Sequence, residues 1–153
     1  MSESKEEIEA NLVRLINETK QFDIDAFLME ETLYNKDMLA KLEEHIKKDE
    51  DLKETLQSKI MLELELENEA GKAGKEFDQI QWKAKKEADH KILALLKRSG
   101  PIDNNIQSNL NLMKQAITFH MDEQKKSIKD DLIDQINEKK KIDAEIEQLL
   151  MLV

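Results

Sequence analysis

The chain has 153 residues, a net charge of −10 and no cysteine. Hydrophobic residues make up 39% of it and charged residues 38%, with only three glycines and one proline. The absence of cysteine excludes disulfides, thiolate metal sites and cysteine nucleophiles. The apolar share is low and the strong helix formers Lys, Glu and Leu are abundant. The composition therefore favours long helices with narrow apolar stripes over a compact globular domain.

The first residues are acidic, and no apolar run approaches the roughly 18 residues of a membrane span. We therefore expect a soluble intracellular protein, cytoplasmic or cytoskeletal, with a nuclear location left open. Residues 1–71 hold 20 acidic and 9 basic side chains, and the chain has two arginines. Nucleic-acid surfaces usually carry a basic stripe rich in arginine, so we expect no nucleic-acid partner.

The N-terminal residues carry a helix start signal. Ser4 followed by Glu7 has the capping-box spacing, and the apolar residues at 8, 12, 15 and 16 fall on one helical face. These features predict a helix over about 4–20 and a short turn near 21–25. Folding the chain back at that turn would place Leu12 opposite Met38.

From residue 26 to residue 98 no proline interrupts the helical pattern, which predicts one long central helix. The charge run at 47–51 and the glycines within 71–74 are the two places where this helix can break. Gly100 and Pro101 then end it, because proline cannot continue a helix. We predict a hairpin corner at 99–103 and a last helix over 103–152.

The last helix shows a heptad repeat with one four-residue stutter, which continues from Ile106 to Val153. With a corner at Gly100, small residues face large ones, as when Ala88 lies opposite Met113. The predicted fold class is thus all-α: an elongated antiparallel coiled-coil rod, in which one long central helix is flanked by a short N-terminal and a long C-terminal helix. Residues 1–153 form a single elongated helical unit in this prediction.

Two regions carry more apolar side chains than one helix seam can bury. Exposing several of them would promote association, so we expect an oligomer formed through coiled-coil packing with other helical proteins or with itself. The predicted interaction residues are Ile60, Met61, Leu62, Leu64, Leu66, Trp82, Ile146, Leu149, Leu150, Met151 and Val153.

Few patterns point to chemistry. Glu87 and His90 have the spacing that supplies half of a di-iron site in helical bundles, but no second copy exists. His120 falls on the apolar stripe, where a polar residue often fixes the register of a coiled coil. We found no catalytic set of residues, and we expect no enzyme activity, no cofactor and no metal.

Trp82 lies next to the lysines of segment 83–86. Such a segment can contact anionic lipid or a nucleic-acid base, but the acidic residues around it favour packing or contact with a partner protein, since Trp is enriched in interface hot spots.

The function that fits best is a non-enzymatic coiled-coil scaffold or subunit of a larger intracellular complex of the cytoskeletal, kinetochore, ciliary or vesicle-tethering type. One alternative is a helical dimer that binds a membrane surface: residues 72–98 hold 8 basic and 4 acidic side chains, although the overall charge argues against it. A bacterial secretion or chaperone-type helical hairpin is the other alternative.

Overall fold

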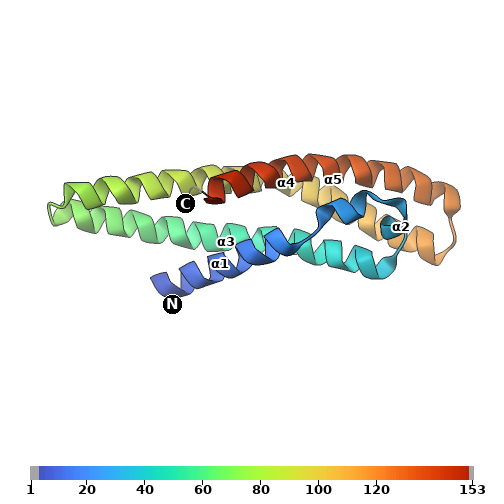
Figure 1. The fold of residues 1–153 in the computed structure, drawn as a ribbon, viewed down its shortest axis with the longest axis horizontal. Helices are drawn as coiled ribbons and strands as arrows, with labels where there is room; N and C mark the ends of the chain where they lie inside the picture. Colours follow the sequence, from blue (N-terminus) through green and yellow to red (C-terminus); the bar gives the residue numbers. More distant parts are fainter. Residues whose placement is uncertain (1–3, 152–153) are drawn as a thin grey trace.

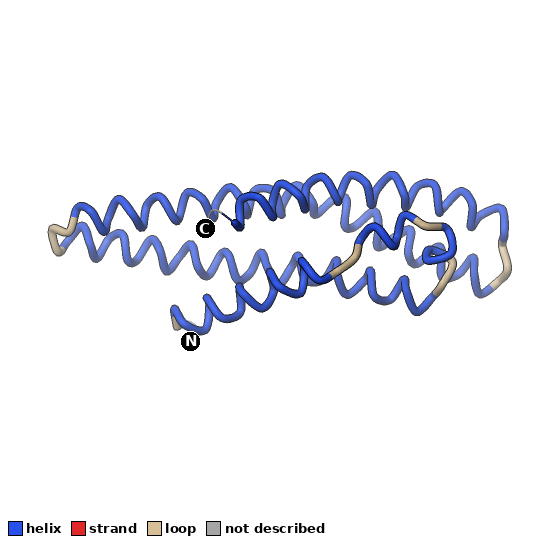
Figure 2. Tube along the Cα trace, viewed as in Figure 1, coloured by secondary structure: helices blue, strands red, loops and turns tan. Residues whose placement is uncertain are grey.

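The computed structural model describes residues 4–151, whose regular elements are all helical. Short loops join these helices (Figure 2). In chain order the elements are α1 (Lys5–Gln21), the 3-10 helix η1 (Ile24–Leu28), α2 (Glu30–Leu33), α3 (Lys36–Lys72), α4 (Glu76–Thr118) and α5 (Asp122–Met151). The all-α fold class and the elongated antiparallel rod are therefore confirmed.

The rod is built on the three long helices. At 1.5 Å per residue, α3 is about 55 Å long and α4 about 65 Å. α4 packs against both α3 and α5, and α1 packs against α3. Figure 1 shows that the hairpin of α3 and α4 extends beyond both ends of the chain, so that one end of the rod has two helices and the rest has more.

The predicted corner at 99–103 is wrong, and with it the helix bounds 26–98 and 103–152. α4 runs from residue 76 to residue 118 and contains Pro101 in its interior. The proline ring is exposed, whereas Ser99 and Asp103 on either side of it are buried. A proline inside a helix costs about 3 kcal/mol. Burial of apolar side chains such as Ile106 and Leu110, about 1.5–3 kcal/mol each, outweighs that cost.

The chain reverses instead at 73–75 and at 119–121, through the same backbone device. Gly74 has φ 73° and the N–H of Lys75 donates to the carbonyl of Ala70 at 2.9 Å. At the other turn, the N–H of Met121 donates to Ala116 at 2.8 Å. These are Schellman-type helix ends, which need a residue in the left-handed conformation. Of the two expected breaks, segment 71–74 contains one and segment 47–51 lies inside α3.

The prediction that His120 fixes the register of a helix seam is also wrong. His120 is exposed and has φ 54°, and it occupies the left-handed position of the turn between α4 and α5. The stutter in the heptad repeat, three successive steps of four residues between positions 120 and 132, begins at this turn. The stutter therefore accompanies a helix end and not a local change in supercoiling. The spacing of side chains alone does not distinguish these two cases.

At the N-terminus the first helix is confirmed, since α1 begins after Ser4, whose side chain accepts from the N–H of Glu7. The predicted pairing of Leu12 with Met38 does not form. Segment 22–35 is too long for a simple turn. It ends at Asn35, whose side chain caps the first turn of α3. α1 therefore lies further along α3, where Asn11 donates to Thr55 at 3.1 Å.

Buried apolar residues gather in two clusters. The first joins η1, α2, α3, α4 and α5 around Phe27 and Leu33, at the end of the rod that holds the turn at 119–121. The second joins α1, α3, α4 and α5 and includes Leu56 and Ile92. Neither cluster contains a residue between Leu56 and Ile92 in the sequence. We call residues 57–91 the distal arm, and the remaining described residues the bundle body.

Candidate functional site

The predicted interaction residues divide into exposed and buried groups. Met61 and Leu64 on α3 are 68% and 45% exposed, which fits a surface for association. Ile60 and Ile146 are instead buried within the chain itself, so they form no part of its outer surface. Ile146 packs in the second core cluster with residues of α1, α3 and α4.

The other predicted residues lie between these extremes. Leu66 is half-buried, and Leu149 packs against the second core cluster. Leu62, Trp82 and Leu150 line a cavity described below. The side chain of Met151 and the whole of Val153 lie outside the described residues.

Sequence reasoning missed two exposed apolar side chains on the distal arm. Phe77 is 71% exposed and Ile80 is 66% exposed, and both follow the turn at Gly74. The misplaced corner had assigned them to the apolar seam of one long helix. Placing the turn at Gly74, a glycine just past a helical stripe, would have moved both to the tip of a hairpin.

These exposed residues share one side of the arm. Glu63 faces α4, where it adjoins Asp89, and Gln79 faces Gly71 on α3, which is too close to accept a Cβ without a shift. Leu64 and Ile80 are the residues that directly follow these two facing positions. Because both helices are right-handed and run antiparallel, the residue after a facing position lies on the same side of each.

The bundle body contains a buried polar network centred on Lys139, whose side chain is fully buried. Its Nζ donates to Asp49 Oδ2 at 2.6 Å, to Asp103 Oδ1 at 2.7 Å and to Ser99 Oγ at 3.3 Å. Asp143 Oδ1 lies 3.8 Å away. The network joins α3, α4 and α5, and Ser99 and Asp103 come from the segment around Pro101 that had been read as a corner.

The charges of this network are coupled. Burial alone lowers the pKa of Lys139, but the carboxylates of Asp49, Asp143 and Asp103 outweigh it and raise that pKa. Burial opposes ionisation of Asp49, yet Lys139 keeps the pKa of Asp49 below its usual value. Burial and the adjacent Asp49 raise the pKa of Asp103 to about 7. Every charge is thus compensated by a neighbour, which indicates a structural role.

The distal arm contains a second buried group of charges, which is less complete. Lys59 Nζ donates to Asp89 Oδ2 at 2.8 Å. Both carboxyl oxygens of Glu63 and the Oδ1 atom of Asp89 are buried without a hydrogen-bond partner. Burial, and then the neighbouring Asp89, raise the pKa of Glu63 to about 8. Unpartnered buried polar atoms are rare in proteins and indicate strain or a missing ligand.

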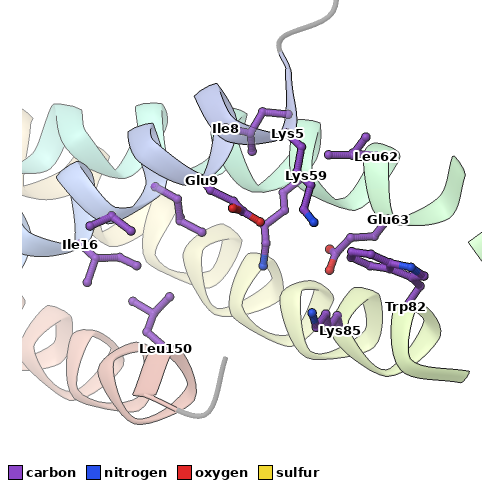
Figure 3. A pocket seen from close by; sticks show the side chains of 12 residues that line it. Lys5, Ile8, Glu9, Ile16, Lys59, Leu62, Glu63, Trp82, Lys85 and Leu150 are labelled. Carbon is purple, nitrogen blue, oxygen red and sulfur yellow. The ribbon is translucent and has the colours of Figure 1, made fainter. Parts of the chain in front are cut away.

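A cavity of about 360 Å³ adjoins this group, where α1 approaches the base of the arm. Figure 3 shows side chains from α1, α3, α4 and the end of α5 around it, with the Glu63 carboxyl next to Trp82. The Nζ atoms of Lys5 and Lys85 lie 5.0 and 4.8 Å from the centre of a Trp82 ring, within cation–π range.

The comparisons with known proteins give no relative. The sequence matches no protein-family model, no curated protein and no solved structure. Among residues 4–151 no helix is long and apolar enough to cross a membrane. Over the same part of the chain, His, Asp and Glu side chains form no group of three or more that could hold a metal ion.

Proposed function

We propose that the protein is a non-enzymatic helical scaffold in which the distal arm pairs with the distal arm of a second copy. The observation that carries this proposal is the exposure of Met61, Leu64, Phe77 and Ile80 on a two-helix hairpin, with Leu64 and Ile80 on the same side of it. Two such hairpins packed side by side would form a four-helix bundle, the arrangement that buries a second apolar face on each helix.

The charge distribution of the arm supports pairing with a copy of itself. Residues 61–72 on α3 carry four glutamates and one lysine, whereas residues 76–91 on α4 carry four acidic side chains and four lysines, three of which lie within 83–86. Glu65 and Lys83 are exposed. In a two-fold symmetric pair, the acidic α3 segment of each copy can lie beside the lysines of segment 83–86 of the other, since an isologous interface repeats every contact.

The consequence for function is a rod with a defined length and two free ends. A dimer joined at the arms would place the two bundle bodies at opposite ends of a longer rod. Such an assembly sets the distance between whatever binds its ends, which is the role that long coiled coils serve in larger complexes. Membership of a particular intracellular complex remains part of the proposal.

Sedimentation velocity over a range of protein concentrations tests the pairing. We expect a dimer for the wild-type chain and a monomer for the double substitution Met61→Ser with Ile80→Ser. Removing these side chains from an interface should raise the dissociation constant by about 100-fold or more, since each buried side chain contributes about 1.5–3 kcal/mol.

The matched control is Met29→Ser with Leu112→Ser, which removes two apolar side chains of the bundle body that are 58% and 50% exposed. This control should remain a dimer. A wild-type chain that is monomeric at every concentration would overturn the proposal. So would a monomer that binds anionic vesicles through Met61 and Ile80, because that result would favour a membrane-surface function.

A further inference from the structure

The cavity at the base of the distal arm has the size and the lining of a ligand site. Its volume of about 360 Å³ lies within the range of roughly 300–1,000 Å³ that is usual for small-molecule sites. One part of its wall is apolar and is formed by Ile8, Leu12 and Ile16 of α1, Leu62 of α3 and Leu150 of α5. An apolar wall shared by three helices suits a flexible hydrocarbon chain better than a polar solute.

The other part of the wall is cationic. Lys5, Lys59 and Lys85 line it, together with Glu9 and Glu63. Lys59 is paired with Asp89, but among the described residues Lys5 and Lys85 form no ion pair and instead lie over the Trp82 ring. With the pKa of Glu63 raised to about 8, this group is mostly neutral near pH 7 and adds little negative charge.

Glu63 adds a buried polar group to the wall of this cavity. Its side chain is 1% exposed, both of its carboxyl oxygens lack a hydrogen-bond partner, and it lines the cavity. A protonated carboxyl carries one O–H donor. Asp89 is the neighbouring acceptor for this donor, so the protonated carboxyl adds no negative charge that would repel an anionic group held between the nearby ammonium groups.

We propose that this cavity binds a single-chain anionic amphiphile, such as a fatty acid, with its head group at Lys5, Lys85 and Glu63 and its chain along the apolar wall. The ligand would join α1 and the end of α5 to the base of the arm. This site does not require the pairing of two arms, so the two proposals can fail separately.

Titration with dodecanoate, below the concentration at which it forms micelles, tests this proposal. Trp82 is the only tryptophan of the chain and lines the cavity, so its fluorescence reports binding at this place. Calorimetry gives the stoichiometry. We expect one dodecanoate per chain, a change in Trp82 emission and a higher melting temperature, because a ligand that binds only the folded state stabilises it.

The double substitution Lys5→Gln with Lys85→Gln should weaken dodecanoate binding by about tenfold or more, since charge-assisted contacts are lost. The matched control Lys91→Gln with Lys97→Gln removes two exposed lysines of α4 that do not line the cavity, and it should change the affinity less than twofold. Dodecylamine has an equally long chain with a cationic head, and we expect it to bind far more weakly.

Three results would overturn the proposal. The first is equal binding of dodecylamine and dodecanoate, which would show that the cationic wall is not used. The second is equal weakening by the two double substitutions, which would indicate a general effect of net charge. The third is binding to phosphatidylglycerol vesicles without binding of monomeric dodecanoate, which would assign the lysines to a membrane surface.

Discussion

The bundle body and the distal arm bury charged side chains in different ways. In the body, Lys139 donates to two aspartates and a serine, and three helices enclose it. In the arm, Lys59 reaches Asp89, but Glu63 is buried without a partner. The Lys139 network of the body thus completes its polar contacts within the chain, whereas Glu63 and Asp89 of the arm keep buried oxygen atoms without a hydrogen-bond partner.

This difference follows from the number of helices. In the body, three or four helices pack together, so that a side chain on one helix has neighbours from at least two others. The arm has two helices, and α1 reaches only its base (Figure 1). A two-helix hairpin can bury one stripe on each helix, which is why Met61 and Phe77 remain exposed. We infer that the body provides most of the stability of the fold and that the arm provides the binding surface.

The largest effect should come from breaking the network of the body. Lys139→Met should lower the free energy of unfolding by about 3–5 kcal/mol, because it leaves buried carboxylates without their counter-charge. Urea denaturation at pH 7 measures this. Combining it with Asp49→Leu and Asp103→Leu should restore stability to within about 1 kcal/mol of wild type. A loss below about 1 kcal/mol for Lys139→Met alone would contradict the burial of this network.

Removing the proline should give the next largest effect. Pro101→Ala should stabilise the body by about 2–3 kcal/mol, because alanine restores a helical N–H and relieves the clash with the preceding turn. The neighbouring substitution Gly100→Ala is the control. Its added Cβ would lie 3.5 Å from Lys53 Nζ, an ordinary contact, and it should gain only about 1 kcal/mol. Destabilisation by Pro101→Ala would contradict a continuous α4.

The pH dependence of the arm provides the third test. Burial and Asp89 raise the pKa of Glu63 to about 8 from a usual value of 4.5. The folded state therefore holds this proton more tightly than the unfolded state. The associated stability is present below pH 4.5 and is lost as the pH rises through about 8.

Glu63→Gln keeps the shape of the side chain and removes the titration. We expect it to stabilise the protein by about 2 kcal/mol at pH 8 relative to wild type, with a smaller difference at pH 5. Comparing the two proteins at each pH cancels the contribution of Asp103, whose pKa is raised in the same direction. A difference that is constant between pH 5 and pH 8 would argue against a buried Glu63.

The smallest effects should come from the two turns. Gly74 has open space around its α-carbon, so Gly74→Ala should cost about 1–2 kcal/mol through backbone conformation alone. His120 occupies the equivalent left-handed position, and His120→Gly should gain about 1 kcal/mol. Thermal denaturation of both variants measures this contrast. Equal changes of the same sign would show that the two turns do not share one geometry.

Part of the candidate site was accessible from the sequence. The excess of apolar residues near residue 60 correctly indicated an exposed surface at Met61 and Leu64, because one seam accommodates only one residue in three or four. The cavity and the unpartnered Glu63 were not accessible. They depend on α1 approaching the arm, and segment 22–35 sets that approach through tertiary contacts of η1 and α2.

The sequence by itself determined the all-α class, the elongated antiparallel form and the start of α1 at Ser4. Each of these depends on composition or on local spacing. Only the tertiary structure decided where the chain reverses. Proline and glycine change the local free energy of a helix by a few kcal/mol, and the burial of several apolar side chains is larger. Pro101 therefore lies inside a helix, and His120 takes the position expected for a glycine.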